Sequence, residues 1–170
     1  MPIKQSIFDD YIKQNFTIFT FEGIKTHLNN RNEEKKDPKG MPSLKNITKD
    51  NCLEYCYEHH NGLAILTGEL SGITCFDFDN KAVYNQMITD FPELKKFKTI
   101  ETKNGYHLYC LYDKTVKTTT DALILPYELI DVRNDAGVLF APPTRYKMLS
   151  GEFFQYKDLG GEILPVPEVF

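Results

Sequence analysis

The sequence lacks several features that would each indicate a particular class of protein. No run of about twenty apolar residues occurs, and the amino terminus has no basic stretch followed by an apolar segment and a small-residue cleavage site. We therefore expect a soluble, intracellular protein with no membrane partner. A Gly-x4-Gly-Lys-Ser/Thr phosphate loop is also missing, which excludes a helicase or ATPase motor within these 170 residues.

Cysteine is scarce as well, and the pattern does not indicate a disulfide scaffold. The four thiols belong to Cys52, Cys56, Cys75 and Cys110, and we expect them to be free. A zinc site at Cys52, Cys56 and His60 is an alternative, because these residues converge on one face if the segment is helical. We favour core-facing positions of an amphipathic helix instead.

An excess of positive charge is missing too, since the formal net charge is −4. Proteins that bind nucleic acid usually neutralise phosphate with lysine and arginine. The basic residues are nevertheless clustered, at Arg31, Lys35, Lys36, Lys39 and Lys45, at Lys95, Lys96, Lys98 and Lys103, and at Lys114 and Lys117. Any binding to a nucleic-acid template should therefore be weak and sensitive to salt.

Length and pattern predict one α+β domain over residues 1–170, because the chain is long enough for a single core and too short for two. Helices are expected near the amino terminus, over 49–60 and over 82–90, and a strand over 16–21. The polar segment 29–42 indicates an exposed, mobile loop. The segment up to residue 170 resembles a linker.

Six further strands are predicted as three hairpins. They are residues 63–67 with 73–79, residues 99–102 with 106–112, and residues 129–133 with 138–141. The middle pair has the strongest signal, because Asn104-Gly105 tolerates the positive φ values of a tight turn. The pair Pro142-Pro143 must end the last strand.

One predicted strand carries two carboxylates. Side chains two apart on a strand share a face, so Asp77 and Asp79 project together and Phe76 and Phe78 project to the other side. Like charges placed side by side are repulsive unless a cation lies between them, and a divalent ion is the simplest candidate. Alternatively, Asp-Phe-Asp-Asn is only a polar strand end.

Two later segments carry further polar groups at strand positions. Lys103 and His107 flank the Asn-Gly turn, where an ammonium and an imidazole can bind a triphosphate, although a strand histidine is often structural. Asp131 and Arg133 share one face of a short apolar strand, where they can also form a simple surface ion pair.

The order Asp-x-Asp, Gly-x-His and apolar-Asp-x-Arg, each on a strand, resembles the archaeo-eukaryotic primase superfamily and its primase-polymerase branch. The matching core covers about residues 62–143, including the Gly68–Gly72 turn and Ala141-Pro142-Pro143. The resemblance implies that Asp77, Asp79 and Asp131 bind two Mg2+ or Mn2+ ions and that His107 binds the nucleotide. It assigns Lys103 and Arg133 to nucleotide binding more weakly, since relatives often have Ser-Gly-Gly-x-His where this chain has Lys-Asn-Gly-Tyr-His.

The resemblance also implies a fold and a function. The expected sheet resembles that of an RNA-recognition motif, and the expected activity is synthesis and extension of primers from nucleoside triphosphates on a single-stranded DNA template. Relatives form the front part of viral or plasmid helicase-primases, so a helicase domain in the same polypeptide and action in the cytoplasm or at a viral replication site are expected. A catalytically inactive replication-initiation module and a metal-dependent nuclease are the alternatives.

Overall fold

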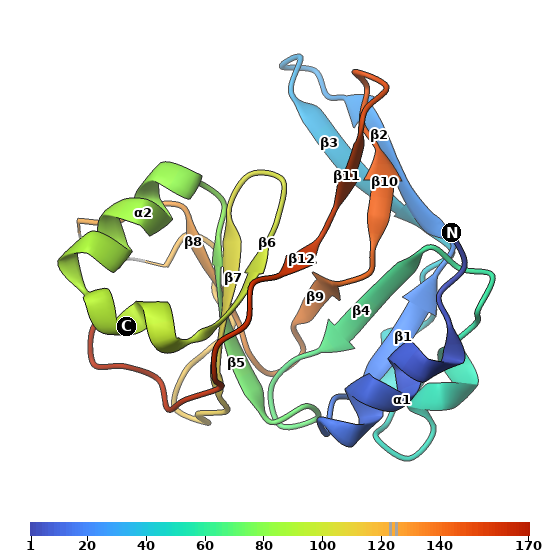
Figure 1. Cartoon of the computed structure of the whole chain (residues 1–170), viewed down its shortest axis with the longest axis horizontal. Coiled ribbons are helices and arrows are strands. Elements are labelled where there is room, and N and C mark those ends of the chain that lie inside the picture. Colours follow the sequence, from blue (N-terminus) through green and yellow to red (C-terminus); the bar gives the residue numbers. More distant parts are fainter. Residues whose placement is uncertain (123, 125) are drawn as a thin grey trace. The chain divides into compact units, whose positions relative to one another are not determined.

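The computed structural model describes residues 1–122, 124 and 126–170, and it has an α+β fold, as predicted (Figure 1). The chain forms two compact units. Unit 1 comprises residues 1–65 and 140–156, and unit 2 comprises residues 66–139 and 157–170. The prediction of a single domain remains a prediction, because a compact unit is not by itself an independently folding domain.

Unit 1 begins with helix α1 (Gln5–Lys13), whose buried face is anchored by Phe8. Strand β1 (Ile18–Phe21) follows and pairs with β4 (Gly62–Leu66) in a sheet of order β1-β4-β9, where β9 is Val138–Ala141. Every residue of β1 and β4 is buried, which fits their continuous apolar composition. The helix and strand predicted for this region are confirmed.

Two hairpins complete unit 1 and extend beside each other (Figure 1). Strand β2 (Gly23–Leu28) pairs with β3 (Glu34–Lys39), and β10 (Arg145–Lys147) pairs with β11 (Phe153–Gln155). The prediction of a loop over 29–42 is therefore wrong. The sequence of β3 is charged and contains Pro38, so it carries no strand signal, and its structure depends on pairing with β2.

The predicted helix over 49–60 is also wrong. Only two short 3-10 helices form here, η1 (Leu44–Asn46) and η2 (Cys52–Tyr55). The hydroxyl of Thr20 on β1 accepts a hydrogen bond from Tyr57 N at 2.8 Å and donates one to Tyr55 O at 3.3 Å. These bonds replace the partners that a continuing helix would supply, and they hold the segment against β1.

Unit 2 is built on a five-stranded antiparallel sheet of order β12-β6-β7-β5-β8. The strands are β5 (Ile73–Phe78), β6 (Lys98–Glu101), β7 (Tyr106–Leu111), β8 (Ile130–Arg133) and β12 (Lys157–Asp158). Helix α2 (Lys81–Asp90) and the 3-10 helix η3 (Pro92–Lys96) pack on the face that carries Phe76, Leu108 and Ile130. The predicted helix over 82–90 is thus confirmed, and Asn80 caps it through Ala82 N.

Of the three predicted hairpins, only β6–β7 is confirmed. The other strands exist but pair differently, since β4 and β9 belong to the sheet with β1 while β5 and β8 pair with each other. The turn at Gly68–Gly72 joins residues 68 and 73 by a single bridge before the chain changes sheet. Strand β9 ends at Ala141, ahead of the two prolines, as predicted.

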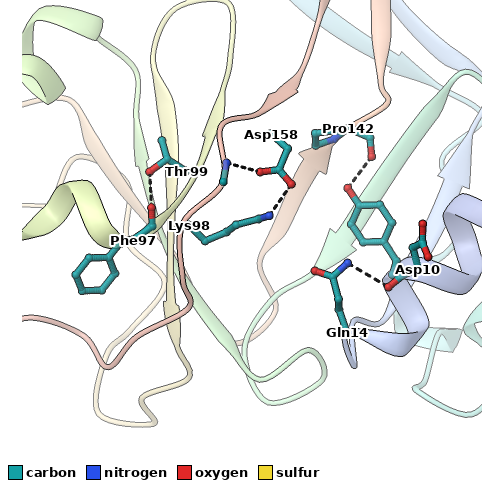
Figure 2. A network of polar contacts seen from close by, with 9 residues as sticks. Asp10, Gln14, Phe97, Lys98, Thr99, Pro142 and Asp158 are labelled. Carbon is teal, nitrogen blue, oxygen red and sulfur yellow. Dashed lines mark hydrogen bonds and ion pairs between the residues drawn. The ribbon is translucent and has the colours of Figure 1, made fainter.

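The last residues pack on unit 2, so the prediction of a linker-like end is wrong. Lys98 Nζ contacts Asp158 at 2.5 Å and ties β12 to β6 (Figure 2). Further along, the ring of Phe170 stacks on Phe76 with centroids 3.7 Å apart. Leu164, Val166, Val169 and Phe170 therefore pack against the core of unit 2 rather than leading away from it.

All four cysteines are free, as predicted, and burial raises the pKa of the Cys56 and Cys110 thiols to about 12. Cys52 and Cys56 lie on the short η2 turn rather than on a long helix. Within the residues described, no helix is both long and apolar enough to cross a membrane.

Candidate active site

The three central strands of unit 2 bring three of the predicted residues side by side. Asp77 on β5 lies directly opposite His107 on β7 and directly opposite Asp131 on β8. Neighbouring residues Phe76, Leu108 and Val132 point to the other face, into the core. Side chains 30 and 54 residues away from Asp77 along the sequence therefore meet at one level of one face of the sheet.

The group is largely withdrawn from solvent. The side chains of Asp77, His107 and Asp131 are 16%, 6% and 8% exposed. His107 Nε2 lies 3.4 Å from Asp77 Oδ1. Because the local dielectric constant is lower than in water, charges in this group interact more strongly than on an open surface.

Arg133, two residues after Asp131, brings its guanidinium between the two carboxylates. Its Nη2 donates to Asp131 Oδ2 at 2.7 Å and lies 4.0 Å from Asp77 Oδ2. Its Nε is buried and has no hydrogen-bond partner among the residues that the structure describes. The protein thus places a cation of its own where two carboxylates lie on adjacent strands, so the Asp131–Arg133 pair is more than an exposed surface ion pair.

The other two predicted residues lie in adjacent loops. Asp79 is exposed and follows the end of β5, where its backbone N–H still bonds Leu129 O at 3.1 Å. Lys103 belongs to the turn between β6 and β7. The structure thus groups Asp77, His107, Asp131 and Arg133 and places Asp79 and Lys103 at the ends of the same strands.

Close packing holds the β6–β7 turn against the start of α2. Lys81 N donates to Asn104 O at 3.0 Å, and Gly105 N donates to Thr102 Oγ1 at 3.0 Å. A Cβ built at Gly105 would meet the backbone oxygen of Phe78 at 1.6 Å, so only glycine fits. The turn with Lys103 and the loop with Asp79 are therefore fixed to each other.

A backbone contact that the sequence did not predict orients Asp131. Its Oδ1 accepts a hydrogen bond from Asp121 N at 2.9 Å. Asn134, directly after β8, is fully buried on the opposite face of the sheet, where it accepts a hydrogen bond from Thr74 Oγ1 and donates to the backbone oxygens of Asp113 and Val116. No sequence signal singles out Asp121, because its contact with Asp131 is made through a backbone N–H.

Cys75 lies two residues before Asp77 on β5 and on the same face of the sheet. Complete burial, and secondarily the negative charge of Asp77, raises the pKa of the Cys75 thiol well above its usual value.

Metal coordination by the protein alone is incomplete. Among the described residues, no group of three or more His, Cys, Asp or Glu side chains is arranged to hold a metal ion. The oxygen donors of Asp77 and Asp131 nevertheless suit Mg2+ or Mn2+, because Mg2+ is commonly bound by one or two carboxylates and completed by water and substrate phosphates. The donor chemistry fits such an ion with its substrate bound.

These features define an α+β protein whose main sheet gathers carboxylates, an imidazole and a guanidinium on one face. The family model for the bifunctional DNA primase/polymerase, N-terminal domain matches residues 10–168. The chain therefore belongs to that family, and the resemblance seen in its motifs is confirmed. No curated protein matches the chain.

Proposed function

We propose that this chain is a nucleotidyltransferase that makes primers and extends them on a DNA template with two Mg2+ or Mn2+ ions. Membership in the primase/polymerase family supports the general activity. The observation that carries the detailed proposal is the alignment of Asp77 on β5 with His107 on β7 and Asp131 on β8 at directly opposed positions.

In this proposal the acidic residues hold the metal ions. Asp77 and Asp131 supply oxygen ligands from the sheet, and Asp79 supplies a further one from the loop after β5. When bound, a pair of ions lowers the pKa of an attacking hydroxyl and neutralises charge on the phosphate during displacement of pyrophosphate. Asp121 N holds one oxygen of Asp131 and so directs the other oxygen towards the site.

The basic residues act on the nucleotide. His107 donates to a phosphate oxygen, and its position beside Asp77 sets where that phosphate lies relative to the carboxylates. Arg133 neutralises the carboxylates before an ion binds and contacts the triphosphate afterwards, because its side chain is a third exposed and its guanidinium is permanently charged. Lys103 adds a positive charge from a turn that close packing holds in place.

The sheet of unit 2 gives this site its platform. One face is filled by α2 and η3, and the other carries the polar residues, which is the arrangement that we propose to be similar to an RNA-recognition motif. A helicase domain in the same polypeptide, and a role in viral or plasmid replication, stay predictions from the motifs.

The test is incubation of the purified chain with single-stranded DNA, labelled nucleotides and Mg2+ or Mn2+, with and without an annealed primer. We expect labelled products in both formats, and their sensitivity to alkali identifies the sugar that is used. Asp77→Asn should abolish incorporation, whereas Glu93→Gln, an exposed carboxylate on η3 in the same unit, should retain it.

Three outcomes would contradict the proposal. Full incorporation by Asp77→Asn would remove the carboxylate from the reaction. Degradation of the DNA with no use of nucleotides would indicate a nuclease, which also uses clustered carboxylates. A folded protein that binds DNA with neither reaction would be an inactive initiation module.

A further inference from the structure

We propose that the outward face of the β10–β11 hairpin in unit 1 binds single-stranded DNA, with Phe153 as a stacking platform for a base. The site consists of Arg145, Lys147, Phe153 and Gln155, and it is separate from the carboxylate site of unit 2. The nature of the partner rests on the proposed function, while the surface itself is argued from unit 1 alone.

The register of the hairpin places these four side chains on one face. Arg145 lies opposite Gln155 and Lys147 opposite Phe153, so the four alternate with the Tyr146–Phe154 pair. Tyr146 is buried and its ring lies 5.8 Å from that of Phe154. The hairpin therefore has one face that packs on unit 1 and one that faces solvent.

The solvent face has an unusual composition for an exposed surface. Phe153 is 61% exposed, the most exposed phenylalanine among the described residues, and the guanidinium of Arg145 lies 4.5 Å from the centre of its ring. A cation held over an exposed aromatic ring contributes little to folding at such a site. It does leave the ring largely exposed, with a positive charge over one of its faces.

Charge in this region favours an anionic partner. The hairpins β2–β3 and β10–β11, taken as residues 23–40 and 144–156, carry seven of the 20 Lys and Arg residues but only four of the 24 Asp and Glu residues. They are net positive by three within a chain that is net negative by four. The two hairpins are joined where Thr26 Oγ1 donates to Lys147 O at 3.2 Å.

The neighbouring hairpin extends the positive surface. Lys25 lies opposite Asp37 and His27 lies opposite Lys35, and both Lys25 and Lys35 are exposed. The ion pair of Lys39 with Asp37 and the pair of Lys35 with Glu33 neutralise part of this charge. The face with Arg145 and Lys147 contains no carboxylate among its four side chains, so we place the contact there.

The chemistry of this face selects a single strand over a duplex. Bases stack on an aromatic side chain only when they are not already stacked between base pairs. Arg145 and Lys147, on the strand next to the ring, provide phosphate contacts, and the amide of Gln155 offers a donor and an acceptor to a base edge. An acidic protein surface would use the cations but would leave Phe153 without a function.

The experiment measures binding of a fluorescent 20-nucleotide oligo(dT) to the full chain by anisotropy at several salt concentrations. Phe153→Leu should weaken binding about 5- to 150-fold, the range expected for loss of stacking by one base, with an unchanged salt dependence. Phe153→Trp should restore it. Arg145→Gln/Lys147→Gln should weaken binding and lower the slope of log Kd against log salt by up to about 1.4.

The matched control is Lys13→Gln/Lys49→Gln, which removes the same charge from exposed positions elsewhere in unit 1 and should leave the slope unchanged. Wild-type affinity and slope in the hairpin variants would overturn the proposal, as would a failure of the wild type to bind the oligonucleotide. Asp77→Asn should bind it normally. Loss of nucleotide incorporation with intact strand binding therefore concerns the carboxylate site alone.

Discussion

Replacing Arg133 by methionine tests the electrostatics of the carboxylate group. Methionine retains an unbranched side chain of similar length to the aliphatic part of arginine. The substitution removes the guanidinium, which bonds Asp131 at 2.7 Å and lies 4.0 Å from Asp77. Hydrogen bonds to charged groups contribute about 1.5–3 kcal/mol, and the two carboxylates then repel each other across adjacent strands. Because Arg133 is a third exposed, solvent screening reduces the total, and we expect a loss of about 2–3 kcal/mol in the free energy of unfolding.

The assay is urea unfolding followed by far-UV circular dichroism, since the chain has no tryptophan. A double-mutant cycle with Asp131→Asn isolates the pairwise term, and the double variant should be more stable than Arg133→Met alone. Mg2+ at about 100 times its Kd should restore roughly 2.7 kcal/mol to Arg133→Met if the ion takes the place of the guanidinium. Equal stability of Arg133→Met and wild type, with no coupling to Asp131, would refute this account.

Three further predictions concern the nucleotide contact, the β6–β7 turn and pH. His107→Ala should raise the KM for nucleotide, because a phosphate contact is lost, as measured by steady-state incorporation on a primed template. Gly105→Ala should cost about 2–4 kcal/mol in urea unfolding, because its Cβ would overlap Phe78 O. Burial is the main cause that lowers the pKa of His60. The free energy of unfolding of the wild type should therefore fall as the pH is lowered from 7.5 to 5.0, and that of His60→Gln should fall less over the same range.

Each of these three predictions has a control or an outcome that would contradict it. An unchanged nucleotide KM with full turnover in His107→Ala would remove the imidazole from the site. Gly72→Ala has a left-handed φ of 66° but open space around it, and an equal cost at both glycines would rule out the overlap as the cause. For His60, a depressed pKa gives stability that is present above the unfolded pKa and lost on acidification, so identical pH profiles in the two proteins would contradict it.

The sequence predicted those parts of the fold that depend on neighbouring residues. Hairpin β6–β7 forms around Asn104-Gly105, and helix α2 begins at an asparagine cap. The alternation of phenylalanine and aspartate over Phe76–Asp79 correctly predicted that Phe76 and Phe78 face the core. In each case the physical cause is turn chemistry, capping or strand periodicity, which acts over a few residues.

The wrong predictions concern pairing over long distances. Strand β8 pairs with β5 rather than with β9, and β3 forms from a charged segment because β2 offers it a partner. The helix expected over 49–60 is replaced by bonds to Thr20, some 35 residues away. Local propensity contains no information on such partners, since the stabilising groups lie elsewhere in the sequence.

The candidate site likewise combines features that were predictable from short motifs with a contact that depends on residues from another segment. Asp77, His107 and Asp131 were identified from their motifs, and the structure brings them to one level of the sheet. The bond from Asp121 N to Asp131 was not predictable, because it depends on how residues 119–122 run beside β8. The role of each residue in metal or nucleotide binding stays a prediction.

The most direct test of the central proposal is nucleotide incorporation by the wild type, Asp131→Asn and Glu93→Gln at equal concentrations of protein and Mn2+. If Asp131 holds a catalytic metal ion, the wild type and Glu93→Gln will incorporate labelled nucleotide on a primed template, and Asp131→Asn will not, although its urea transition shows that it is folded under the assay conditions. Incorporation by a folded Asp131→Asn at the wild-type rate would contradict the assignment of this site.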